Sequence, residues 1–150
     1  MHPFGGKFFQ LAGICLLALL IQTPGAALAD QATLADCPPS PNCVSSLAGN
    51  DEQKVDPLPG LGSRQASMDL LERVIKAQPR TTWTRLSPAR AEATFTTAIM
   101  RFTDDVSFHV REDGSIDVRS ASRVGHWDLG ANRRRVERLR EELADHAGHP

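Results

Sequence analysis

Three consecutive segments in the second half of the chain alternate between apolar and polar residues. They cover residues 92–100, 105–111 and 116–120. Because successive side chains of a β-strand point to opposite faces, this period of two predicts strands that each have one apolar face. Asp113 and Gly114 lie between the second and third segments and favour the positive φ of a tight hairpin turn. We therefore expect an antiparallel sheet that must be covered on one side.

Two other segments have the helical spacing that could provide this cover. Residues 63–78 form the first, which Pro79 ends, and the second runs from about residue 132 to Ala144. Their apolar positions are Met68, Leu71, Val74, Ile75, Val136, Leu139 and Leu143. A short β-branched segment at 81–86 predicts one more strand. The order helix, four strands, helix predicts an α+β fold, a small antiparallel sheet of about four strands covered by two helices.

The same periodicities predict which side chains form the core. In the segment 92–100, Phe95 and Ile99 fall on one face, and Phe102 and Phe108 continue the apolar pattern beyond it. Large aromatic side chains are usually buried in soluble domains. We therefore expect these phenylalanines in the core rather than on a ligand platform.

The first 29 residues resemble a secretory signal peptide. Lys7 is the basic residue, residues 8–21 form a short apolar run, and Ala27-Leu28-Ala29 is a small-x-small cleavage pattern. We expect cleavage after Ala29 and a periplasmic location, with membrane contact only through an uncleaved signal segment. The predicted parts are the signal peptide 1–29, an irregular Pro- and Gly-rich strap 30–62, an α+β core 63–146 and a disordered tail 147–150.

Two cysteines remain after signal removal, Cys37 and Cys43, because Cys15 lies in the signal segment. An oxidising compartment predicts that they form a disulfide, which would close a short proline-rich loop. The expected contribution to stability is about 2 kcal/mol. A zinc site would need two more ligands, and a redox-active pair usually has C-x-x-C spacing. The sequence therefore favours a structural disulfide.

The charge balance limits the partners of the chain. Loss of Lys7 leaves 16 basic against 18 acidic residues, so a broad basic surface for nucleic acid is not expected. No pattern of residues indicates a metal site or a cofactor. We expect a monomer whose partner is a small anionic ligand or an envelope protein.

Charged and polar residues are concentrated between residues 101 and 135. The candidate cluster contains Asp104, Asp105, Arg119, Ser120, Ser122, Arg123, Asp128, Asn132, Arg133 and Arg135. Arginines 133–135 lie near the start of the last helix and acidic residues near its end, the reverse of what the helix dipole favours. These arginines are therefore expected to have specific partners, of which Asp104, Asp105 and Asp128 are the obvious candidates.

Three functions remain open for this cluster. A structural ion-pair network would leave function to protein partners, and it predicts that Asp105→Ala costs a few kcal/mol because a buried arginine loses its partner. Arginines left over would bind a carboxylate or phosphate. A hydrolase would use Ser120 or Ser122 with His126 and Asp128. The sequence favours a non-enzymatic binding or envelope-accessory module.

Four motifs, in order along the chain, resemble those of the DUF1499 family, a group of mostly exported proteins of unknown function. They are CPPSPNCVSS at 37–46, FTDDV at 102–106, VRSASRVG at 118–125 and DLGANRRRVE at 128–137. The resemblance covers about residues 37–140. It implies a shared fold and an exported location, and it implies no activity.

Overall fold

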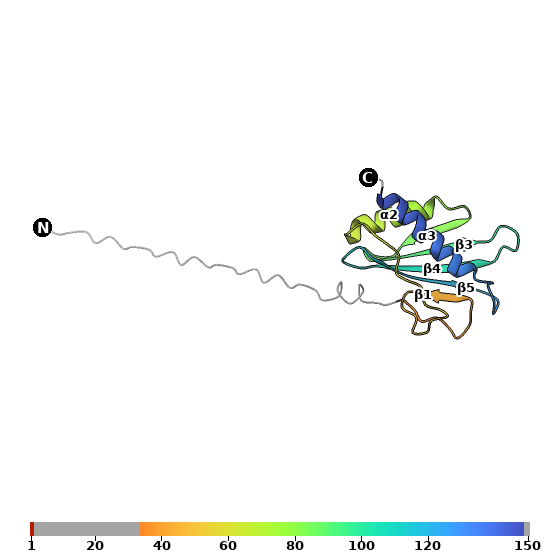
Figure 1. The fold of residues 1–150 in the computed structure, drawn as a ribbon. Helices are drawn as coiled ribbons and strands as arrows, with labels where there is room; N and C mark the ends of the chain where they lie inside the picture. The colour runs from red at the N-terminus through yellow and green to blue at the C-terminus, as the bar shows by residue number, and fades with distance from the viewer. Residues whose placement is uncertain (2–33, 149–150) are drawn as a thin grey trace.

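The computed structural model describes Met1 and residues 34–148. In this part of the chain the elements are β1 (Cys43–Ser45), α2 (Arg64–Lys76), β2 (Thr81–Arg85), β3 (Arg90–Thr96), β4 (Thr103–Val110), β5 (Ile116–Ser122) and α3 (Ala131–Gly148). The strands form an antiparallel sheet in the order β1-β5-β4-β3-β2 (Figure 1). The α+β class is confirmed, with a fifth strand in addition to the predicted four.

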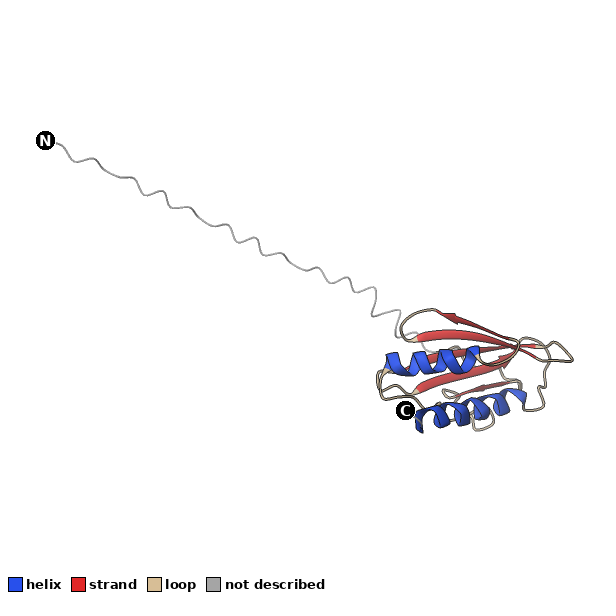
Figure 2. Ribbon diagram, turned by 90° about the horizontal axis from the view of Figure 1, so that it is seen from above, coloured by secondary structure: helices blue, strands red, loops and turns tan. Residues whose placement is uncertain are grey.

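Both helices pack on one face of the sheet (Figure 2). Alternation along β4 turns Val106, Phe108 and Val110 toward the helices, and all three are fully buried. Helix α2 begins after Ser63, whose side chain accepts a hydrogen bond from the backbone N–H of Ala66 and caps the first turn. The buried stripes of α2 and α3 and the inward faces of the strands form one apolar core.

The predicted irregular strap contains β1, which the sequence interpretation missed. Cys43 pairs with Ala121 of β5, and Ser45 pairs with Arg119. Isolated bridges join Ser45 to Lys54 and Leu58 to Ile116, so the strap is bonded to the sheet at several points. A three-residue strand that follows a proline-rich turn is too short to show a periodicity, and its stability comes from pairing with β5. The predicted disulfide between Cys37 and Cys43 is present.

Strand β3 is shorter than the period of two predicts. It ends at Thr96, where the backbone N–H of Thr97 donates to the carbonyl of Phe102 and closes a turn. The predicted core residues Ile99 and Phe102 are 90% and 46% exposed. Arg101, within this turn, has a φ of 53°. The turn geometry therefore overrides the alternation and places apolar side chains in solvent.

The end of the last helix also differs from the prediction. Helix α3 continues past Ala144 to Gly148, so residues 147 and 148 of the predicted tail are helical. The signal segment and its cleavage site lie outside the described residues. No helix within residues 34–148 is long and apolar enough to cross a membrane.

Candidate functional site

The sheet divides the predicted cluster into two groups. Neighbouring residues of a strand face opposite sides, so Asp104 points toward the helices whereas Asp105 points away from them. Asp104 is 2% exposed, and the Asp105 side chain is 46% exposed. The two aspartates therefore have different partners, and only Asp104 belongs to the core side of the sheet.

On the helix side, Arg135 of α3 is the cation that pairs with Asp104. Its guanidinium donates to the Asp104 carboxylate, to Ser120 Oγ at 3.0 Å and to Asn132 Oδ1 at 2.7 Å. The guanidinium also lies 4.9 Å from the centre of the Phe95 ring. Both charges are almost completely buried, so each depends on the other for compensation.

Asn132 connects this pair to the rest of the domain. Its side-chain oxygen accepts from Ser120 Oγ at 2.6 Å. Its Nδ2 donates to the carbonyl of Asn42 at 3.0 Å, to Ser122 Oγ at 2.9 Å and to an oxygen of Asp128. Asn132 is completely buried. One amide therefore joins the disulfide loop, β5 and the start of α3.

Asp128 caps the start of α3. Its carboxylate accepts from the backbone N–H groups of Gly130 and Asn132, each at 2.8 Å, and from the Asn132 side chain. Partial burial raises the pKa of Asp128, but these hydrogen bonds together outweigh it and hold the pKa below its usual value. A negative charge at this position also complements the helix dipole.

Replacing Asp128 with asparagine should therefore reduce stability more at pH 7 than in acid. A carboxyl whose pKa is lower in the folded state stabilises the fold above its unfolded pKa of about 3.9, and this stabilisation is lost as the pH falls through the folded value. Because asparagine can still cap the helix, only the charge contribution is removed, and we expect a loss of about 0.3–1 kcal/mol at pH 7 that is smaller near pH 2. Urea unfolding at both pH values measures it. An equal loss at the two pH values would contradict the assignment, and Asp51→Asn is the control for removal of an exposed carboxylate.

On the open side of the sheet, Asp105 pairs with Arg123. The Arg123 guanidinium donates two hydrogen bonds to the Asp105 carboxylate at 2.8 and 2.9 Å, and these bonds raise the pKa of Arg123. Both side chains are about half exposed. The predicted large cost of Asp105→Ala assumed a buried arginine partner, whereas Arg123 is about half exposed, so we expect a small cost instead. Arg119 also lies on this side, and its buried Nε has no hydrogen-bond partner in residues 34–148.

Other arginines of α3 hold the strap by its backbone. Arg133 donates to the carbonyl oxygens of Lys54 at 2.8 Å and Glu52 at 2.7 Å. Arg140 donates to the carbonyls of residues 56 and 57. Of the three arginines at the start of α3, only Arg135 pairs with one of the predicted aspartates. The other cations near the unfavourable end of the helix dipole are compensated by carbonyl groups instead.

The residues of the predicted hydrolase are not arranged for catalysis. The hydroxyl of Ser120 is buried and donates to Asn132, and Ser122 accepts from the same amide. In the described residues no hydrogen bond joins His126 to either serine. The His126 ring is exposed and contacts the edge of Trp127, with 5.3 Å between ring centroids. Asp128 caps a helix and does not orient the histidine.

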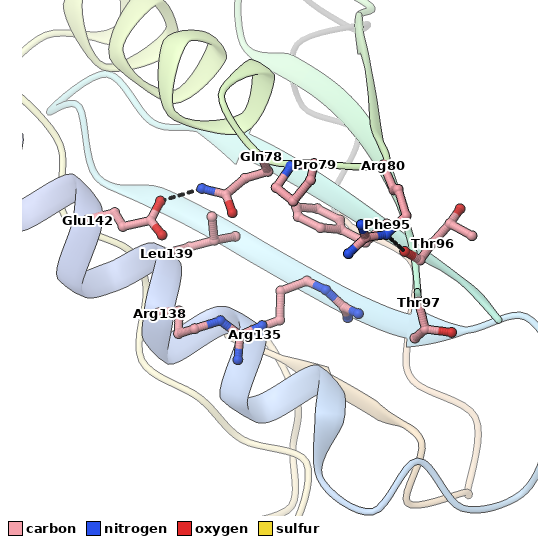
Figure 3. Close-up of a pocket in the computed structure, with 10 residues that line it drawn as sticks. All are labelled: Gln78, Pro79, Arg80, Phe95, Thr96, Thr97, Arg135, Arg138, Leu139 and Glu142. Carbon is pink, nitrogen blue, oxygen red and sulfur yellow. Dashed lines mark hydrogen bonds between the residues drawn. The ribbon is translucent and has the colours of Figure 1, made fainter. Parts of the chain in front are cut away.

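A separate pocket of about 200 Å³ lies between α3, the end of β3 and the turn after α2 (Figure 3). Three arginines line it, Arg80, Arg135 and Arg138, together with the apolar Phe95 and Leu139. Its one acidic residue, Glu142, accepts a hydrogen bond from Gln78 at 2.6 Å. The lining therefore has an excess of positive charge.

Two of these arginines have guanidinium N–H groups without a hydrogen-bond partner among residues 34–148. Arg80 uses its Nε to bond the carbonyl of Thr96 at 3.2 Å, and its terminal nitrogens have no partner among residues 34–148. Arg138 has no hydrogen bond or ion pair in the same range. Sequence reasoning missed both residues. The signal for Arg138 was its position one helical turn after Arg135, whereas Arg80 lies in the turn after α2, with a φ of 55°, and has no periodic signal.

The fold and site define a small α+β domain with a buried polar network between its sheet and helices. An arginine-lined pocket lies at the edge of that network. The chain belongs to the DUF1499 family, proteins of unknown function, whose sequence model matches residues 33–143. The resemblance of the four motifs is thus confirmed. The matched range contains the whole polar network. A comparison with curated proteins finds no match.

Proposed function

We propose that the protein is an exported, non-enzymatic binding module whose ligand carries a carboxylate or phosphate group. The observation that supports this proposal is the placement of Arg80 and Arg138 in one pocket with unused guanidinium donors. Export is supported by the signal-like pattern of residues 1–29.

The chemistry of the pocket fits a small anionic group. A guanidinium binds carboxylate and phosphate through paired, charge-assisted hydrogen bonds. Phe95 and Leu139 provide apolar contact beside those donors. The volume of about 200 Å³ is below the range of about 300–1,000 Å³ typical of drug-sized ligands. The site therefore suits a small anion or one head group of a larger molecule.

The buried network is a support for this pocket rather than a second ligand site. Arg135 lines the pocket, but its charge is compensated by Asp104, and one of its terminal nitrogens donates to both Ser120 and Asn132. An arginine so held is fixed in position and cannot reorient toward a ligand. Ligand binding is therefore assigned to Arg80 and Arg138.

Binding of inorganic phosphate and of acetate, measured by calorimetry, tests this assignment. Arg80→Gln and Arg138→Gln should each weaken binding of the preferred anion at least tenfold, because a hydrogen bond to a charged group contributes about 1.5–3 kcal/mol. Arg73→Gln is the matched control, since Arg73 is exposed on α2 away from the pocket. Equal weakening in the control, or unchanged binding in the double variant, would reject the pocket as the site.

A further inference from the structure

Exposed apolar side chains gather on two loops at one end of the sheet. One loop, 97–102, joins β3 to β4, and the other, 123–130, joins β5 to α3 (Figure 1). The exposed fractions are 90% for Ile99, 66% for Met100, 46% for Phe102, 60% for Val124, 71% for Trp127 and 86% for Leu129. We call these six residues the apolar tip. A cluster of this kind on a soluble domain marks an interaction surface.

The two loops form one continuous surface. Phe102 from the first loop and Val124, Trp127 and Leu129 from the second line a common, mainly apolar pocket of about 500 Å³. The backbone N–H of Arg123 donates to the carbonyl of Thr103 at 3.1 Å, which joins the bases of the loops. The apolar tip therefore belongs to one site and not to two unrelated loops.

The backbone presents Leu129 to solvent at a conformational cost. Its φ is 53°, a value that leucine rarely adopts, and its side chain is 86% exposed. The loop is held there by the Asp128 cap and by Arg134, which donates to the carbonyl of Leu129 at 2.8 Å. The exposed Leu129 side chain adds no burial to the fold despite this backbone strain, which supports a role in binding.

The charges of the molecule favour an anionic partner at this end. Arg101 lies in the 97–102 loop beside the apolar tip and has no partner in residues 34–148, and Arg133 and Arg134 lie at the adjacent start of α3, where they donate to carbonyl oxygens. Among the carboxylates at this end, Asp104 pairs with Arg135, Asp105 pairs with Arg123, and Asp128 accepts from the helix N–H groups. The acidic residues of α3 lie toward its other end, which Figure 1 shows near the opposite end of the sheet. Electrostatic attraction would therefore bring the apolar tip toward a negative surface.

We propose that the apolar tip inserts into the interfacial region of an anionic lipid bilayer, with Arg101 contacting lipid head groups. Exposed apolar side chains that include a tryptophan are suited to the boundary between lipid head groups and acyl chains. An adjacent arginine can contact the anionic head groups. This mode of contact differs from the predicted uncleaved anchor because the folded domain itself binds the membrane. It uses other residues than the anion pocket, so either proposal can fail alone.

Vesicle co-sedimentation of residues 30–150 tests the proposal. This range contains the whole core and the disulfide and omits the apolar segment 8–21, which would bind vesicles by itself. Binding to vesicles of phosphatidylglycerol and phosphatidylcholine in equal parts should exceed binding to phosphatidylcholine alone by at least tenfold and should fall with added salt. Trp127 fluorescence should shift to the blue on binding, and Trp127→Phe should remove most of the shift while retaining binding.

Substitutions locate the contact. Ile99→Ser combined with Leu129→Asn should lower the partition coefficient at least tenfold, and asparagine tolerates the positive φ at position 129. Arg101→Gln should weaken binding to the anionic vesicles only. Leu86→Ser, at a distant exposed leucine, is the matched control and should change nothing. The absence of binding to anionic vesicles would overturn the proposal. If the protein instead forms a concentration-dependent dimer that the double variant abolishes, the apolar tip is a protein interface and the proposal is rejected.

Discussion

Replacement of Asp104 with alanine is expected to lower the free energy of unfolding by about 3–5 kcal/mol, the usual cost of removing one partner of a buried ion pair. The reason is that Arg135 would keep its charge at a site where its side chain is only 7% exposed to water. Urea unfolding followed by circular dichroism measures the change. The expected loss is a large part of the total stability of a domain of this size.

Asp105→Ala provides the matched control, because it removes the same side chain from the next position of the same strand. Its partner Arg123 is about half exposed and remains hydrated when the carboxylate is lost. We expect a change below about 1 kcal/mol. Similar losses in the two variants would contradict the division of the cluster by the sheet. Adding Arg135→Met to Asp104→Ala should recover part of the loss, since no buried charge then remains unpaired.

Replacement of Asn132 with alanine is expected to cost about 3 kcal/mol or more. The change leaves the Asn42 carbonyl, the Ser120 hydroxyl and one Arg135 donor without a partner that they have in the intact protein. Each buried polar group that loses its hydrogen bond costs about 1–3 kcal/mol, although Asn42 keeps a bond from the Ser122 backbone. Urea unfolding gives the magnitude.

Hydrogen exchange distinguishes this role of Asn132 from a local effect on α3. Because Asn132 bonds the Asn42 carbonyl, its loss should increase amide exchange in β1 as well as at the start of the helix. Asn50→Ala is the control, since Asn50 is exposed and its side chain bonds only Gln53. Unchanged exchange in β1, with a loss of stability no larger than in the control, would contradict the connecting role.

The period of two in β4 and β5 predicted more than the strands themselves. It placed Val106 and Phe108 in the core, and the same parity separates Asp104 from Asp105, although the sequence interpretation treated the two as one cluster. By contrast, the exposure of Phe102 was not predictable from the pattern. A turn closed by a hydrogen bond between Thr97 and Phe102 interrupts the alternation, and such a bond leaves no periodic signal.

The sequence predicted the residue types of the site but not which partner each arginine has. Arginines at the start of α3 were expected to have partners, and they do, but Arg133 bonds backbone carbonyls of the strap rather than carboxylates. Backbone carbonyls are present at every position, so the sequence does not mark the ones that accept. Arg80 was missed because it lies in the turn after α2, with a left-handed backbone conformation that arginine seldom adopts, and has no periodic signal.

The sequence by itself determined the α+β class, the buried faces of the strands and helices, the disulfide and the family motifs. These features depend on local periodicity and on residues close together in the chain. Only the tertiary structure decided which arginines are compensated and which remain available to a ligand. The partners of Arg133 and Arg135 lie 79 and 31 positions away in the chain, and electrostatic compensation depends on distance and burial in space rather than on sequence order.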